Sequence, residues 1–70
     1  MMPLLLAPQG EENIIRKLGG SRELKKHLED LGFVPGGRVT VISAIAGNLI
    51  VRVKDSRVAI SKEMAGKIFV

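Results

Sequence analysis

The fold is decided by one short stretch in the middle of the chain, Leu31-Gly32-Phe33-Val34-Pro35-Gly36-Gly37-Arg38-Val39. Leucines recur at helical spacing before it, and Gly32 stands where a helix ends, because glycine adopts the left-handed terminating conformation at the lowest cost. Pro35 cannot extend a helix, and Pro35-Gly36 fits the central positions of a type II turn. The residues after Arg38 favour a strand. The stretch therefore predicts a helix end, a tight turn and a strand entry, which together set the angle between a helix and a sheet.

Outward from this stretch, the pattern predicts one helix and five short strands. The helix covers residues 21–31, with Ser21 as its N-cap and a leucine stripe that packs against the sheet. Strands are expected at residues 12–18, 38–45, 49–54, 57–60 and 67–70, with one helical turn at 62–65. Gly47-Asn48 and Asp55-Ser56 are the predicted hairpin turns. The apolar leader, residues 1–8, is expected to lie across the sheet or to close one end of a barrel.

These elements predict a mainly β fold with a short helix: an SH3-like small five-stranded barrel, with the helix inserted between strands one and two. Closure removes unpaired sheet edges, which matters in a chain of 70 residues. An open α+β sheet is the alternative. The sequence contains no long linker, repeat or low-complexity segment, so residues 1–70 are expected to form a single SH3-like domain.

The composition indicates a basic chain that depends on apolar packing. The net charge is +4, and 46% of the residues are hydrophobic. A basic balance is compatible with an acidic protein face, an anionic membrane surface or nucleic acid. The apolar leader is too short to span a membrane and lacks the features of a signal peptide, so a cytoplasmic location is expected. The absence of cysteine and the single histidine leave no disulfide or zinc site to reinforce the core.

No catalytic, cofactor or metal site is predicted, and the chain is not expected to be an enzyme. His27 is the one imidazole, and six residues separate it from Ser21, so the two side chains lie on different faces of the predicted helix. Structural zinc requires four nitrogen or sulfur ligands. Gly19-Gly20-Ser21 precedes the helix but lacks the lysine spacing of a phosphate-binding loop, so a simple turn is the preferred interpretation.

Two surfaces are candidates for binding a partner. The first is the nearest approach to a basic cluster, which lies on the predicted helix. The second is an apolar surplus: Ile42, Ile50 and Phe69 fall opposite the expected core side, and Ile45 and Leu49 flank the tip of the first hairpin. Either some of these residues are exposed, or the register differs by one residue, or the helix covers that face. The residues predicted to contact a partner are Arg22, Lys25, Lys26, Ile45 and Leu49.

The order of these segments resembles the FeoA family, the small ferrous iron transport proteins A of bacteria and archaea. The resemblance covers nearly the whole chain: the leader at residues 3–10, Ile14 to Leu18, Leu28-Glu29-Asp30-Leu31-Gly32-Phe33-Val34-Pro35-Gly36, residues 58–65 and residues 67–70. One departure is Lys26-His27, where the family pattern has a basic pair before Leu28.

The resemblance implies an SH3-like barrel and a cytoplasmic accessory protein of ferrous iron uptake. The implied partner is FeoB, a membrane permease with a cytosolic GTP-binding domain, whose GTP hydrolysis or assembly the protein would regulate. A homo-oligomer stays open. The same barrel occurs as the C-terminal module of iron- or manganese-dependent transcriptional repressors, although a chain that starts at Met1 without a helix-turn-helix favours the free-standing protein. A nucleic-acid-binding barrel is disfavoured, since Phe33 and Phe69 are the only aromatic residues.

Overall fold

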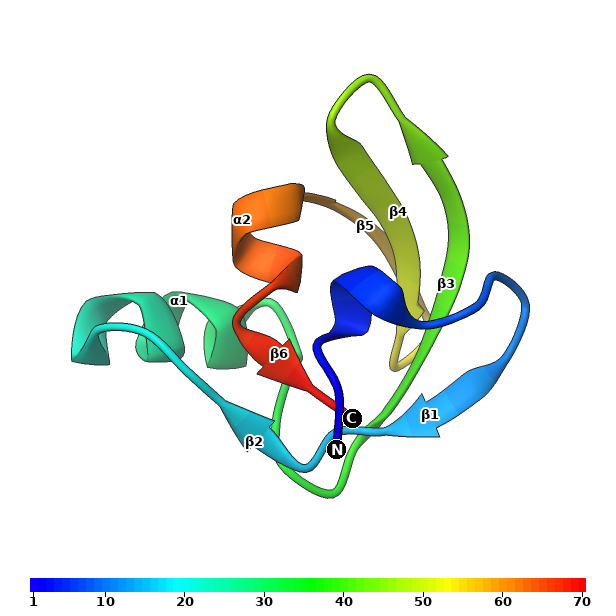
Figure 1. Ribbon diagram of the computed structural model, residues 1–70. Coiled ribbons are helices and arrows are strands. Elements are labelled where there is room, and N and C mark those ends of the chain that lie inside the picture. The colour runs from blue at the N-terminus through cyan, green and yellow to red at the C-terminus, as the bar shows by residue number, and fades with distance from the viewer.

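The chain folds into short strands with two helices and a 3-10 turn, as the computed structural model of residues 1–70 describes (Figure 1). In chain order the elements are η1 (Leu4–Leu6), β1 (Glu12–Ile14), β2 (Lys17–Leu18), α1 (Arg22–Asp30), β3 (Arg38–Ile45), β4 (Asn48–Val53), β5 (Ser56–Ser61), α2 (Lys62–Ala65) and β6 (Ile68–Phe69). The prediction of a mainly β chain with a short helix between the first two predicted strands, residues 12–18 and 38–45, is confirmed.

The strands form two antiparallel sheets and not one closed barrel. One sheet has the order β1-β3-β4-β5, and the other pairs β2 with β6. The predicted first strand, residues 12–18, is interrupted, because Ile15 donates its backbone N–H to Gly37 while Arg16 donates to Phe69, at 2.8 and 2.7 Å. The chain therefore passes from one sheet to the other between these two residues, and the barrel stays open because β5 pairs with no strand of the smaller sheet.

Helix α1 is bounded by the residues that the sequence assigns to its ends. The Ser21 hydroxyl accepts a hydrogen bond from the Leu24 backbone N–H at 3.1 Å. At the other end, Gly32 has a φ of +109° and donates its N–H to the Glu29 carbonyl at 2.9 Å. The tight turn that follows is also confirmed, because Gly37 donates to the Val34 carbonyl at 2.9 Å across Pro35 and a Gly36 with φ of +89°.

Both hairpins turn one residue earlier than predicted. The first turn is Ala46-Gly47, with positive φ at both positions, so Ile45 pairs with Asn48. The second is Lys54-Asp55, which pairs Val53 with Ser56. The sequence signal at Gly47 fits either position of a two-residue turn, and here the glycine takes the second position of a type I′ turn.

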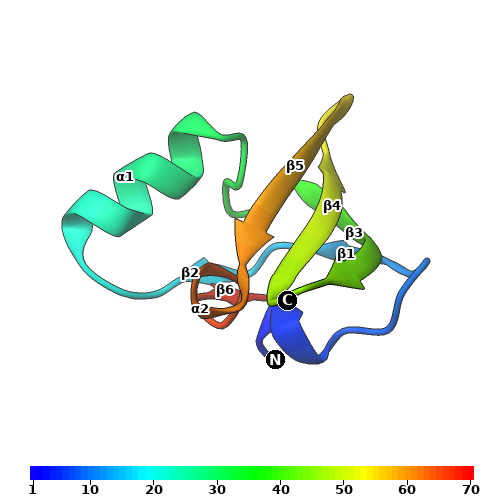
Figure 2. The ribbon, with the colours of Figure 1, turned by 90° about the horizontal axis from the view of Figure 1, so that it is seen from above.

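The core lies between the two sheets and is closed by α1, α2 and η1 (Figures 1 and 2). It contains Leu4, Ile15, Leu18, Leu28, Phe33, Val39, Val41, Leu49, Val51, Val53, Ile60, Ala65 and Ile68. The leader meets one expectation, since Leu4 is buried and η1 packs against α2 and β6. Met2 and Val70 exchange backbone hydrogen bonds at 2.8 Å, which ties the first residues to the last.

The residues that formed the predicted apolar surplus are half-buried. Ile42, Ile50 and Phe69 are each neither fully exposed nor part of the buried core. Ile42 lies at a β-bulge, where the pairing of β3 with β4 shifts between Val41 and Ser43. A bulge inserts one residue into a strand and changes which face the following side chains occupy. The large exposed apolar side chains lie elsewhere in the chain.

Candidate functional site

Helix α1 stands to one side of the sheets and carries the predicted basic residues on its exposed surface (Figure 2). Leu28 is fully buried and Leu24 half-buried, which attaches one face of the helix to the core. Arg22, Lys25 and Lys26 are all exposed. The helix therefore presents these three cations to solvent, as the sequence predicts, and a partner can reach them without a change of fold.

A shallow hollow of about 310 Å³ lies beside α1, and we call it the helix hollow. It is formed where α1, the β1–β2 region and the turn at Pro35 meet, and its lining residues are Arg16, Lys17, Leu18, Lys25, Glu29 and Pro35. Of the predicted residues, Lys25 lines this hollow, whereas Arg22 and Lys26 do not. Three cations face one carboxylate, so the helix hollow favours an acidic group.

The two predicted apolar contacts at the first hairpin separate in the structure. Ile45 is 61% exposed and lies beside the turn. Leu49 is only 3% exposed and belongs to the core. The expectation that Leu49 is exposed at the hairpin tip is wrong, because the turn lies one residue earlier and β4 already directs this side chain inward. Ile45 remains available to a partner.

Further exposed apolar residues lie in the N-terminal leader, which was expected to cover the sheet or one end of a barrel. Met1 is 80% and Leu6 70% exposed, and Leu5 is 38% exposed. The 3-10 turn directs Leu4 alone into the core, so its two neighbours point away. The three consecutive leucines indicate an apolar segment. Three residues are too few to show the periodicity that would predict a helical turn.

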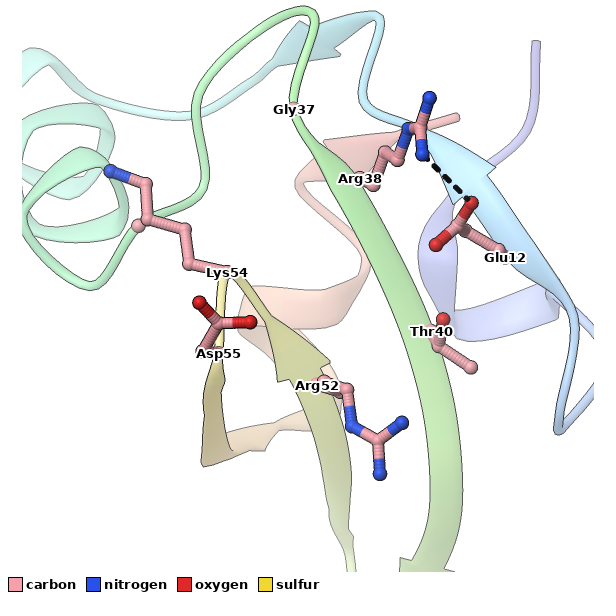
Figure 3. A pocket seen from close by; sticks show the side chains of 8 residues that line it. Glu12, Gly37, Arg38, Thr40, Arg52, Lys54 and Asp55 are labelled. Atoms are coloured by element: carbon pink, nitrogen blue, oxygen red, sulfur yellow. Dashed lines mark ion pairs between the residues drawn. The ribbon is translucent and has the colours of Figure 1, made fainter.

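A second hollow, which we call the sheet groove, crosses the outer face of the larger sheet and was not predicted (Figure 3). It encloses about 350 Å³ and is lined by Glu12, Gly32, Gly37, Arg38, Thr40, Arg52, Lys54 and Asp55. One Nη of Arg38 lies 3.8 Å from Glu12 Oε1, with both side chains mostly exposed. The sequence does contain a signal for it, since cations alternate with buried valines on two strands that pair.

The histidine and the serine considered as catalytic groups belong to helix α1 and its N-cap. His27 is exposed in the last turn of α1, and the Ser21 hydroxyl serves as the helix cap. No three side chains of histidine, aspartate or glutamate gather in a group that could hold a metal ion. None of the helices has the length and apolar character that crossing a membrane requires.

Comparison with known proteins gives a match along almost the whole chain. The family model of the FeoA domain matches residues 2–70. The chain is 34% identical to Fe(2+) transport protein A of Methanocaldococcus jannaschii, over all of this chain and 85% of the relative. It also superposes on the crystal structure of an iron uptake regulatory protein, FeoA, with a TM-score of 0.87 and 26% identity, covering 96% of this chain and 91% of the other.

Two more distant structures share the fold. The FeoA of Stenotrophomonas maltophilia, a procaryotic SH3 domain protein crystallised with zinc, has a TM-score of 0.80 at 23% identity, over 99% of this chain and 88% of that one. A manganese-dependent transcriptional repressor has a TM-score of 0.85 at 16% identity, and the match covers 94% of this chain but 38% of the repressor. The SH3-like fold predicted from the sequence is thereby confirmed.

Proposed function

The chain belongs to the FeoA family of ferrous iron transport proteins, and from this membership we propose that it docks on and regulates FeoB, the GTP-binding membrane permease. The observation that carries the proposal is the family match over residues 2–70. On this proposal residues 1–70 form a single docking domain. The chain acts by binding, without a catalytic group of its own, at the cytoplasmic side of the membrane where the permease exposes its GTP-binding domain.

The proposed docking surface is the exposed side of α1 together with the helix hollow. Arg22, Lys25 and Lys26 are exposed on a helix that is fixed to the core through Leu28. Cations placed in this way attract an acidic face during encounter and orient it before contact. Ile45, at the tip of the first hairpin, is a second point of contact on this proposal, and its exposed apolar side chain can be buried by a partner.

The likeness to a transcriptional repressor does not lead to a second proposal. At 16% identity it reflects the fold alone, and the matched region is a minor part of the repressor. The FeoA crystal structure with a TM-score of 0.87 covers this chain slightly better than the repressor does, and the FeoA family model matches as well. The transport role is therefore the better supported of the two.

The test is an NMR titration of labelled protein with the GTP-binding domain of the permease, first with GDP and then with a GTP analogue. We expect shifts in the amides of α1 and the β3–β4 turn that survive moderate salt. Lys25→Glu should weaken binding severalfold, because reversing a charge at an interface rim lowers the association rate. Arg57→Glu is the matched control, since Arg57 is exposed on β5, away from the first hairpin, and lines neither hollow. The absence of shifts with either nucleotide would exclude docking on this domain.

A further inference from the structure

The sheet groove has an unusual lining for a hollow in a small protein. None of its eight lining residues is hydrophobic. Sites for small organic ligands are lined mostly by apolar and aromatic side chains, with a few polar groups for orientation. The groove therefore does not suit such a ligand, and its charged lining points to a polar, charged one.

The strand register assembles the groove from residues far apart in the sequence. Thr40 of β3 lies opposite Glu12 on one side and opposite Arg52 on the other. Arg52 in turn lies opposite Arg57 of β5, just outside the groove. Side chains directly opposite on neighbouring strands share a face of the sheet. One row of polar side chains thus crosses all four strands on the face away from the core, and Figure 3 shows the part of it that lines the groove.

The cations on this face of the sheet form few ion pairs with carboxylates of the same chain. The one ion pair of the structure joins Arg38 to Glu12 at 3.8 Å, with side chains 72% and 59% exposed. Pairs as exposed as this contribute at most about 1 kcal/mol. Arg52 and Arg57 face each other, and like charges directly opposite destabilise a sheet. An anion bound beside Arg52 would relieve this repulsion.

From this arrangement we propose that the sheet groove binds an acidic peptide segment of a partner protein in an extended conformation. Neighbouring strands lie about 4.8 Å apart, and alternate residues of one strand about 6.8 Å apart. The groove's two arginines lie on neighbouring strands, Arg38 on β3 and Arg52 on β4, one strand and two residues apart because Arg52 pairs with Thr40; Lys54 adds a third cation from the turn that follows β4. An extended peptide repeats its side chains at the same interval, and arginine receives a carboxylate through two parallel hydrogen bonds.

The two carboxylates of the groove decide between classes of anion. Glu12 lies on one side of it and Asp55 on the other (Figure 3). A polyphosphate, a nucleic acid backbone or an anionic membrane brings closely spaced negative charge and meets both carboxylates unfavourably. A peptide alternates acidic with neutral side chains, and its backbone N–H groups can donate to Glu12 or Asp55. The mixed charge therefore favours a peptide over the other anions.

The experiment titrates labelled protein with a synthetic hexapeptide that alternates glutamate and serine, and with the same peptide carrying glutamine for glutamate. We expect the glutamate peptide alone to shift amides of residues 38–40 and 52–55, at millimolar concentration. Arg52→Gln should weaken binding about threefold, as expected for one exposed charge pair. Arg16→Gln is the matched control, because Arg16 is exposed and lines the helix hollow instead. Neither substitution removes a buried side chain, so both variants should fold.

Three results would overturn the proposal. The first is no shift, or equal shifts with the glutamine peptide. The second is an equal weakening of peptide binding by Arg16→Gln, which would show that the effect depends only on the net charge of the protein. The third is a tighter response of the same amides to inorganic pyrophosphate or to vesicles containing phosphatidylglycerol, which would identify a general polyanion site. Because the probe is a peptide and not the permease, this result does not depend on the proposed function.

Discussion

The backbone N–H of Phe33 donates to the carbonyl of Leu28 at 2.9 Å, across the end of α1. With the bond from Gly32 to Glu29 it forms a Schellman motif, which satisfies carbonyls that a helix end leaves free. Leu28 and Phe33 are both fully buried. The motif therefore joins the end of the helix directly to the core. It requires a residue in the left-handed conformation between Leu28 and Phe33, and Gly32 is that residue.

The first prediction concerns that left-handed residue. Gly32→Ala should lower the free energy of unfolding by about 1–3 kcal/mol, because φ at this position is +109° and only glycine adopts it without strain. The cause is conformational and not steric, since an added Cβ would lie 3.6 Å from its nearest neighbour, Lys54 Cδ. Urea unfolding measures the change.

Gly66→Ala provides the control, at the end of the other helix. Gly66 has a φ of −69° in the right-handed region, and an added Cβ would lie 3.4 Å from the nearest carbonyl, that of Glu63. The substitution should leave stability unchanged or raise it by about 0.5 kcal/mol, because alanine loses less entropy on folding. Equal losses from both substitutions would contradict this account of Gly32.

Local signals were sufficient to predict α1 and its end from the sequence. Ser21, Gly32 and Pro35 each act on residues within one or two turns, so their effects are visible in a short window. The split of the first strand was not visible in this way. It depends on hydrogen bonds from Ile15 to Gly37 and from Arg16 to Phe69, whose partners lie far along the chain. The sheet groove escaped prediction for the same reason, because its row of residues exists only once the register is known.

The second prediction concerns the first hairpin. Ala46 has a φ of +47° in the first position of the turn, where type I′ geometry prefers asparagine followed by glycine. Ala46→Asn should therefore raise the free energy of unfolding by about 0.5–1 kcal/mol. Ala44→Asn is the control at an exposed strand position, and it should slightly lower stability because asparagine is disfavoured in strands. A loss of stability in Ala46→Asn would contradict the assigned turn.

The third prediction separates the two apolar residues of this hairpin. Leu49→Ala should cost about 2–5 kcal/mol, because it leaves a cavity in the core. Ile45→Ala should change stability by less than about 0.5 kcal/mol, since the side chain is 61% exposed. Thermal unfolding followed by circular dichroism distinguishes them. If Ile45 contacts the permease, the folded Ile45→Ala protein should also bind the GTP-binding domain more weakly, and unchanged binding would remove the hairpin tip from the docking surface.

The fourth prediction concerns one substitution that should raise stability and weaken peptide binding at the sheet groove. Arg57→Glu replaces a pair of like charges across β4 and β5 with an opposite pair, Arg52 facing a glutamate. It should raise the free energy of unfolding by about 0.5 kcal/mol. The new carboxylate also competes for Arg52, so the affinity for the glutamate hexapeptide should fall about threefold. Urea unfolding and the NMR titration measure the two effects on one protein.

Lys17→Glu is the control for the change in net charge, because Lys17 is exposed on β2 and pairs there with Phe69. This substitution should change the affinity for the glutamate hexapeptide less than Arg57→Glu does, because salt screens a distant charge. It should not raise the free energy of unfolding. A stabilised Arg57→Glu protein that binds the peptide as before would show that the repulsion is real but that Arg52 takes no part in binding. A destabilised protein would show that the two arginines already avoid each other through their long, exposed side chains.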